Sequence, residues 1–203
     1  MNNKPVSLGV FDIECNEYMK YQYLPIAMPM QPTRIEERLG PFLSLIEAAM
    51  YDYADLNNRD FMASYIYLTV KSEYQRGGCG FNRPGWHIDS YLTDNIDYIY
   101  SNIQPTIFNS GKFNLTKDHE ISLQEMKEQA KEENNYTFPS CSLIRVGRAV
   151  HKVADFVEGH RIFVKITFSK EKFNLLGNSH NYLIDYNWDM KERKNSRNHP
   201  SVI

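Results

Sequence analysis

The sequence has few cysteines, no long apolar run and no excess of charge of one sign. Its three cysteines, Cys15, Cys79 and Cys141, lie far apart, a pattern that favours free thiols in a reducing compartment over a disulfide framework or a zinc finger. No stretch approaches the roughly 20 apolar residues that a membrane-spanning helix needs, and the first residues show no secretion signal. These absences predict a soluble cytoplasmic protein.

The charge balance makes nucleic acid a less favoured partner. The chain has 23 basic and 25 acidic residues and a formal net charge of −2, whereas a protein that coats nucleic acid normally carries a basic stripe. The C-terminal tail does hold four basic residues, and aromatic residues could stack on a base; the basic residues are Lys191, Arg193, Lys194 and Arg197. A small molecule or a peptide side chain is the favoured substrate, with nucleic acid as the alternative.

The 203 residues fit a single domain, because the sequence contains no internal repeat and no linker rich in glycine and serine. The N-terminal part, residues 1–61, begins with an extended or irregular segment. It continues with a helix over 34–57, where apolar residues recur at steps of three and four. A core is expected over 62–188 and a polar tail over 189–203.

Most of the core has the composition of short strands. A capping box at Ser122 and Glu125 predicts one helix, and the glycine-rich residues 75–86 are expected to form a mobile loop that could serve as a lid. Many short strands with few helices predict a mostly β protein, a sandwich or jelly roll with flanking α-helices. The expected strands are 64–74, 86–92, 96–100, 105–109, 141–153 and 161–169.

His87 and Asp89 form an H-x-D pair at the end of the glycine-rich loop. In an extended segment, residues i and i+2 project from the same face, so the imidazole and the carboxylate would lie side by side. A second histidine would complete a set of two histidines and one carboxylate, which is typical of non-haem Fe(II) oxygenases. An H-x-D pair also arises by chance, and the alternative is a surface turn.

His151 and Arg161 stand ten residues apart in two strand-like segments. If a turn at 155–160 joined these segments as a hairpin, the two side chains would be near neighbours. An arginine there can bind one end of a dicarboxylate whose other end chelates a metal. The rival pair is His160 with Lys170, but His160 falls in the expected turn, which favours His151.

The order and spacing of His87, Asp89, His151 and Arg161 resemble the H-x-D…H…R signature of the Fe(II)/2-oxoglutarate-dependent oxygenases. The resemblance covers roughly residues 62–170. It implies a double-stranded β-helix, which is a cupin-like jelly roll, and a dioxygenase that uses Fe(II), 2-oxoglutarate and O₂. The C-terminal segment, rich in asparagine and tyrosine, is similar to oxygenases from bacteriophage genomes.

The resemblance also implies roles for these residues. His87, Asp89 and His151 would hold the iron as the catalytic metal ligands, and Arg161 would bind 2-oxoglutarate. The enzyme would decarboxylate 2-oxoglutarate to succinate and hydroxylate an unidentified substrate. The alternative is a metal-binding jelly-roll protein without 2-oxoglutarate turnover, either a binding or structural protein or a metalloenzyme of another kind. The role of Arg161 distinguishes the oxygenase from this alternative, because the alternative needs no site for a dicarboxylate.

Further site residues are expected from their places near this set. Tyr98 and Tyr100 share one face of a strand, where a hydroxyl could bind 2-oxoglutarate or the rings could pack in the core. Arg83 and Trp86, just before the H-x-D pair, could line a substrate site or anchor the loop. Arg145 has the same strand parity as His151, which predicts that it faces the barrel interior and pairs with a carboxylate of the protein or the substrate; a local twist could instead turn it outward.

Alternation along the last strand, 161–169, separates its two faces. One face is entirely apolar and should pack on the helix over 34–57; it consists of Ile162, Val164, Ile166 and Phe168. The other face begins with Arg161 and also carries Phe163, Lys165 and Thr167. If Arg161 does not bind the co-substrate, Lys165 or Lys170 is the next candidate.

Overall fold

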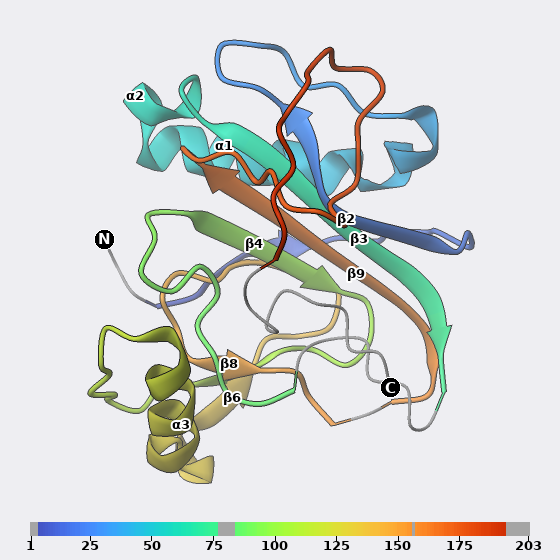
Figure 1. Cartoon of the computed structure of the whole chain (residues 1–203). Helices are drawn as coiled ribbons and strands as arrows, with labels where there is room; N and C mark the ends of the chain where they lie inside the picture. The colour runs from blue at the N-terminus through green and yellow to red at the C-terminus, as the bar shows by residue number, and fades with distance from the viewer. Residues whose placement is uncertain (1–3, 77–83, 156, 194–203) are drawn as a thin grey trace.

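Figure 1 shows a computed structural model of the chain, which describes residues 4–76, 84–155 and 157–193. The described residues form two antiparallel sheets and a few helices, which confirms the prediction of a mostly β protein. The large sheet has the strand order β1-β7-β4-β9-β3-β2, and the small sheet has the order β6-β5-β8. Strands that follow one another in sequence therefore often belong to different sheets.

The element bounds are as follows. The large sheet contains β1 (Val6–Val10), β2 (Met19–Ala27), β3 (Tyr65–Gln75), β4 (Ile96–Ser101), β7 (Ser142–Arg145) and β9 (Gly159–Ser169). The small sheet contains β5 (Ile107–Asn109), β6 (Asn135–Thr137) and β8 (His151–Lys152). The helices are η1 (Glu37–Phe42), α1 (Leu43–Leu56), α2 (Asn58–Phe61), α3 (His119–Gln129) and η2 (Glu132–Asn134).

Three segments refine or correct the sequence prediction. The N-terminal segment, expected to be extended or irregular, contains the strands β1 and β2, in which Pro25 is tolerated because β2 is an edge strand. The expected strand 86–92 is reduced to an isolated bridge at His87, which turns follow. The expected strand 141–153 is split into β7 and β8, which lie in different sheets. A turn at Gly147, where φ is +64°, separates them, and glycine adopts this conformation without steric cost.

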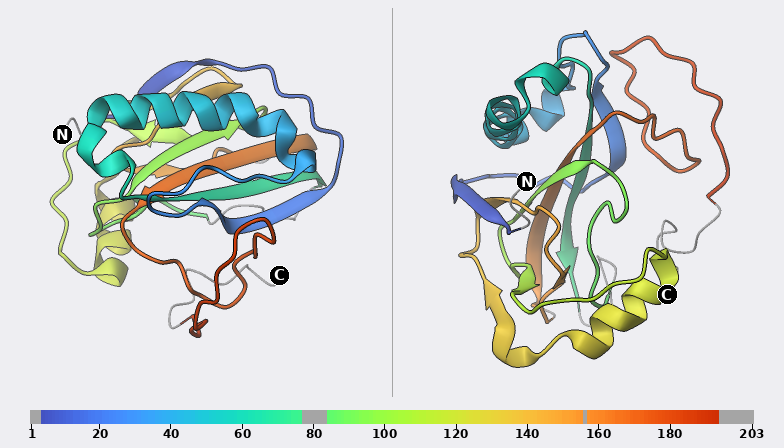
Figure 2. Two further views of the ribbon diagram at one scale, coloured as in Figure 1. Left: turned by 90° about the horizontal axis from the view of Figure 1, so that it is seen from above. Right: turned by 90° about the vertical axis from the view of Figure 1, so that its left-hand side faces the viewer.

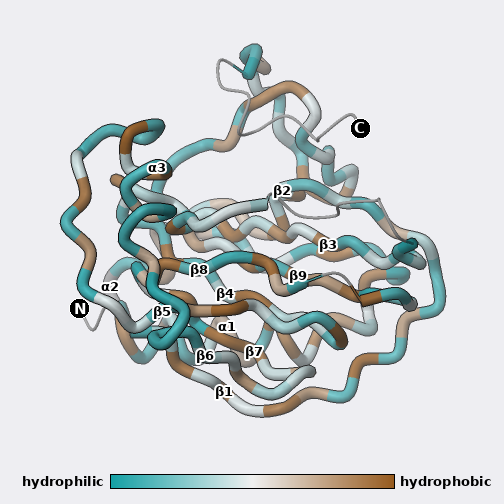
Figure 3. The backbone as a smooth tube through the Cα atoms, turned by 90° about the horizontal axis from the view of Figure 1, so that it is seen from below, coloured by the Kyte–Doolittle hydropathy of each residue, from teal (hydrophilic) through white to brown (hydrophobic). Residues whose placement is uncertain are grey.

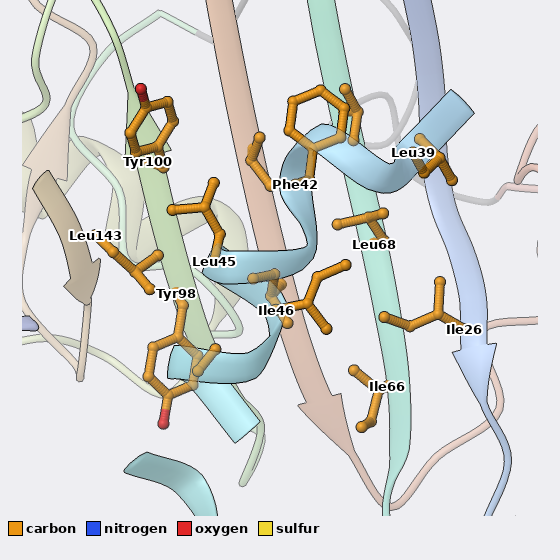
Figure 4. Packing of buried hydrophobic residues seen from close by; sticks show 14 of the residues in the cluster. Ile26, Leu39, Phe42, Leu45, Ile46, Ile66, Leu68, Tyr98, Tyr100 and Leu143 are labelled. Atoms are coloured by element: carbon orange, nitrogen blue, oxygen red, sulfur yellow. The ribbon is translucent and has the colours of Figure 1, made fainter. Parts of the chain in front are cut away.

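Helix α1 covers one face of the large sheet, as the left view of Figure 2 shows. In Figure 4, Leu45 and Ile46 of α1 lie over the strands of the large sheet, with Leu45 beside Tyr100 of β4. The apolar face of β9 belongs to the same buried cluster, as predicted, with Ile162, Val164, Ile166 and Phe168. The main hydrophobic core therefore lies between α1 and this face of the sheet.

Truncation of Leu45 should test this core. Leu45 is fully buried, and a Leu→Ala change at such a site removes buried methyl groups and leaves a cavity. We expect Leu45→Ala to lower the free energy of unfolding by about 3 kcal/mol. Leu43→Ala in the same helix is the matched control, because Leu43 is 42% exposed, and it should cost less than about 1 kcal/mol. Chemical denaturation would measure both; equal costs would contradict this placement of the core.

The opposite face of the large sheet is polar and yet largely buried. Figure 3 shows hydrophilic and hydrophobic residues alternating along its strands. Buried polar groups are costly unless they have partners, so this face is a candidate for function. Its buried polar side chains include Thr69, Gln75, Asp97, Ser101, Arg161, Lys165, Thr167 and Ser169.

The small sheet packs against one end of this polar face. Phe108 of β5 forms a buried cluster with Ile99 of β4 and with Ile144 and Val146 at the end of β7. The two sheets therefore enclose an interior that is apolar at this end and polar along β9.

Helix α3 supports the small sheet from outside. It begins three residues before the predicted capping box, because the carboxylate of Asp118 accepts hydrogen bonds from the backbone N–H groups of Glu120 and Ile121. Its Met126 is buried against Ile88 and Val150. Among the described residues, no helix is long and apolar enough to cross a membrane.

Candidate metal centre

Two distant histidines are brought together by the backbone. His87 and His151 are directly opposed in an isolated antiparallel bridge, in which each backbone N–H donates to the other residue's carbonyl at 2.9 Å. The side chains of such a pair lie on the same side, and the two ring centroids are 4.5 Å apart. Ile88 and Val150, which pack on α3, hold both segments in place.

Asp89 completes a group of three potential metal ligands. Its Oδ1 atom lies 3.9 Å from Nε2 of His87, and its Oδ2 atom lies 3.7 Å from Nε2 of His151. One ligand atom from each of the three residues falls within 4.8 Å of the others. Within the described ranges, no other group of three or more His, Cys, Asp or Glu side chains lies close enough together to hold a metal ion.

The hydrogen bonds of both imidazoles define their tautomer. Nδ1 of His87 lies 2.9 Å from the carbonyl of Gly85, and Nδ1 of His151 lies 2.9 Å from the carbonyl of Ala149. A carbonyl oxygen can only accept, so Nδ1 carries the hydrogen in each neutral ring and Nε2 carries the lone pair. Metal-ligating histidines are oriented in the same way by such contacts.

Lys165 of β9 contacts the carboxylate of this group. Its Nζ atom lies 3.0 Å from Asp89 Oδ2 and 3.4 Å from Asp97 Oδ1. Burial alone would raise the pKa of Asp89, but the charge of Lys165, with smaller contributions from His151 and His87 when they are protonated, outweighs it and holds that pKa well below its usual value. Burial alone would lower the pKa of Lys165, but Asp89 and Asp97 raise it well above its usual value. The lysine and the carboxylate therefore form a charged pair.

The sequence analysis missed Asp97, a residue of β4 that is only 3% exposed. Its carboxylate accepts hydrogen bonds at 2.5 Å from Thr167 Oγ1 and from Ser90 Oγ. Its sequence signal is a single carboxylate in a strand of mostly apolar and aromatic residues, on the face opposite to the tyrosines.

Arg161 lies on the same face of β9 as Lys165, four residues away, which is about 13 Å between Cα atoms. It is 2% exposed, and its Nε donates a hydrogen bond to Ser101 Oγ at 3.1 Å. Burial lowers its pKa to about 10, with Glu73 of β3 acting in the opposite direction, so the guanidinium is charged at neutral pH.

The predicted hairpin between His151 and Arg161 is not formed. His151 lies in β8 of the small sheet, whereas β9 pairs with β3 and β4 in the large sheet. The face of β9 that carries Arg161 and Lys165 is nevertheless turned towards the group of ligands, because Lys165 contacts Asp89. His151 and Arg161 therefore lie in two different sheets, and not in adjacent strands of one sheet.

The structure does not bring Tyr98 and Tyr100 to the ligand group. Both lie on the face of β4 that packs under α1, where Tyr98 Oη donates to Asp52 at 2.7 Å and Tyr100 Oη donates to the carbonyl of Phe11 at 3.3 Å. The core-packing alternative describes them correctly. The interior is lined instead by the alternate residues Asp97 and Ser101.

Arg145 is likewise on the side of α1, with Nη1 2.6 Å from Asp52 Oδ2. Its carboxylate partner is therefore a protein side chain, and the structure does not bring Arg145 to the ligand group. The parity that linked Arg145 to His151 fails because the turn at Gly147 separates their strands.

The remaining predicted residues have different outcomes. Trp86 packs beside Ile88 and Met126, with Lys152 Nζ 5.0 Å from the centre of its ring, so its role in substrate binding stays a prediction. Arg83, Cys79 and most of the expected lid lie outside the described residues, as do Lys194 and Arg197 of the tail.

The rival pair, His160 with Lys170, does not meet the ligand group. His160 Nε2 contacts Ser72 Oγ at 3.2 Å, and that hydroxyl lies on the face of the sheet towards α1. Lys170 forms an ion pair at 2.9 Å with Asp60, and both side chains are well exposed.

Comparisons with known proteins add little to this picture. Neither a protein-family model nor a curated protein matches the sequence. Two crystal structures of EvdO2 from Micromonospora carbonacea var. aurantiaca are similar in shape, with TM-scores of 0.41 and 0.40 and sequence identities of 9% and 11%. In each comparison 72% of this chain and 76% of that chain are covered, and the second structure is complexed with 2-oxoglutarate. Similarity at this level does not establish a shared fold or activity.

Proposed function

We propose that this chain is an Fe(II)- and 2-oxoglutarate-dependent oxygenase. The convergence of His87, Asp89 and His151 is the observation that carries the proposal. Two histidines and one carboxylate are the ligand set that leaves adjacent metal positions open for a co-substrate and oxygen. Arg161, on the sheet face turned towards this group, provides a buried cation for a dicarboxylate.

The strand order supports a double-stranded β-helix as the fold behind this function. From residue 65 onwards the chain passes between the two sheets: β3 is in the large sheet, His87 pairs with the small sheet, and β4 returns to the large sheet. The strands β5 and β6 lie in the small sheet, β7 in the large, β8 in the small and β9 in the large. Double-sheet jelly rolls are built from such crossings.

The residues present fit a divalent metal ion. Both imidazoles carry the lone pair on Nε2, the atom that approaches Asp89, and the pKa of Asp89 is low enough to keep it ionised. These are the protonation states that metal binding requires. When bound, iron and 2-oxoglutarate supply the oxidising chemistry, in which O₂ is consumed, 2-oxoglutarate is decarboxylated to succinate and a C–H group of the substrate is hydroxylated.

The protein's own contribution is to bind and orient the co-substrate. Arg161 is fixed by its hydrogen bond to Ser101 and by packing over the ring of Phe163, whose centre is 5.2 Å from its Cζ atom. A guanidinium held in this way can bind a carboxylate through two parallel hydrogen bonds. In this proposal, a five-carbon dicarboxylate would extend from Arg161 towards the ligand group along the face of β9 that also carries Lys165. The proposed primary substrate is a small molecule or a peptide side chain.

Anaerobic titration tests the proposal. The full chain, loaded with Fe(II) in the absence of O₂, is titrated with 2-oxoglutarate while the visible spectrum is recorded. We expect a weak metal-to-ligand charge-transfer band that saturates with 2-oxoglutarate, followed by succinate formation when O₂ is admitted. Bound iron without this band would instead support the alternative, a metal-binding protein without 2-oxoglutarate turnover.

A further inference from the structure

A buried lysine lies between the candidate ligand Asp89 and a second carboxylate. Nζ of Lys165 is 3.0 Å from Asp89 Oδ2 and 3.4 Å from Asp97 Oδ1. The side chains are only 11%, 20% and 3% exposed for Lys165, Asp89 and Asp97. Charges this well shielded from water interact more strongly than surface charges do. The ammonium group is therefore shared between two anions.

We propose that Lys165 competes with the divalent metal ion for Asp89, and that Asp97 takes over the lysine when the metal binds. This rests on the function proposed above, because it concerns the same carboxylate. A metal ion and an ammonium group on one carboxylate repel each other, and little water is present to screen them. The metal affinity of the site then depends on Lys165 and Asp97 as well as on the three ligands.

Asp97 is well placed to receive the lysine. Thr167 donates a hydrogen bond at 2.5 Å to Oδ1 of its carboxylate, and Ser90 donates one at 2.5 Å to Oδ2. The carboxylate of Asp97 is therefore already oriented. The lysine is close to Asp97 before any metal binds, and a small movement of Nζ transfers its contact from Asp89 to Asp97. Ser90 follows Asp89 in the chain, which links the accepting carboxylate to the segment that bears the ligand.

The lysine also accounts for the stability of the site without a metal ion. Two buried carboxylates with no cation between them are costly, because each loses its hydration. Lys165 offsets this cost in the metal-free protein, and the metal offsets it in the loaded protein. In both states, a cation therefore faces Asp89.

Titration with Mn²⁺ tests the competition without any turnover. Mn²⁺ binding to the full chain is measured by isothermal titration calorimetry at one pH and without 2-oxoglutarate. Lys165→Met keeps the length of the side chain and removes its charge, and we expect Mn²⁺ to bind on the order of tenfold more tightly. Arg145→Met is the matched control, because it removes a partly buried cation from the same sheet, one that pairs with Asp52 beneath α1 and not with Asp89. It should leave the Mn²⁺ affinity within about threefold of the wild type.

Asp97→Asn should lower the Mn²⁺ affinity, whereas Lys165→Met should raise it. Lys165 then has Asp89 as its remaining carboxylate, and Mn²⁺ binding should weaken on the order of tenfold. The increase in Mn²⁺ affinity caused by Lys165→Met should be larger in the Asp97→Asn background than in the wild type. A double-mutant cycle measures this difference.

The possible results separate this proposal from the oxygenase function. If folded Lys165→Met binds Mn²⁺ with unchanged or lower affinity, the competition is wrong, whereas the charge-transfer band with 2-oxoglutarate could still be present. If neither the wild type nor Lys165→Met binds Mn²⁺, both proposals are wrong. Should circular dichroism show that Lys165→Met is unfolded, Asp97→Asn decides alone, and unchanged or tighter binding by that variant would overturn the competition.

Discussion

His151→Ala is expected to lower the affinity for Fe(II) or Mn²⁺ by at least about a hundredfold and to abolish succinate formation. The substitution removes one of the three ligands, and loss of an outer-shell partner alone typically costs 10–100-fold in metal affinity. The fold should survive, because the bridge to His87 is made by backbone atoms at 2.9 Å and does not involve the imidazole. Calorimetric titration with Mn²⁺ and an anaerobic Fe(II) assay measure the loss.

His160→Ala is the matched control for this substitution. His160 is also partly buried, but its ring contacts Ser72 on the far side of β9, so metal binding should remain unchanged. The assignment of His151 as a ligand would be wrong if His151→Ala bound the metal normally while its circular dichroism matched the wild type. Equal losses in both variants would indicate a general effect on the fold.

The fold was predictable where a strand kept one pattern along its length. The strict alternation of β9 correctly predicted which residues pack against the helix, because burial of an apolar face is decided locally by residue type. The separation of β7 from β8 was not predictable in this way. Their residues form one continuous strand-like run in the sequence, and the sheet that each joins depends on pairing partners far away in the chain.

The candidate site was also predictable from the sequence only in part. The H-x-D pair and His151 were found from residue type and spacing, because few side chains bind metals and only six histidines are present. Lys165 was named only as a substitute for Arg161, since a lysine on an alternating strand usually faces solvent. Its contact with Asp89 depends on how the two sheets face each other. For Tyr98 and Tyr100, strand parity showed that the two residues share a face without showing that this face packs under α1.

Arg161→Met is expected to weaken 2-oxoglutarate binding to the Fe(II)-loaded chain by on the order of a hundredfold, while metal affinity stays nearly unchanged. Loss of one partner from a buried, hydrogen-bonded pair of charges costs about 2–5 kcal/mol, and a hundredfold change corresponds to about 2.7 kcal/mol. The guanidinium is 2% exposed, so water cannot replace it as a partner of the carboxylate. The concentration of 2-oxoglutarate that gives half of the charge-transfer band measures the effect.

Arg145→Met is the matched control, because Arg145 is also partly buried but pairs with Asp52 beneath α1. It should lower stability and leave 2-oxoglutarate binding unchanged. If Arg161→Met bound 2-oxoglutarate as the wild type does, the dicarboxylate would need another cation. Lys170 is paired with Asp60 at the surface, so the role would pass to Lys165, and Lys165→Met would then have to lose the charge-transfer band. Arg161 and Lys165 are thus assigned separate roles, one towards the co-substrate and one towards the metal, and each variant tests one role without removing the other.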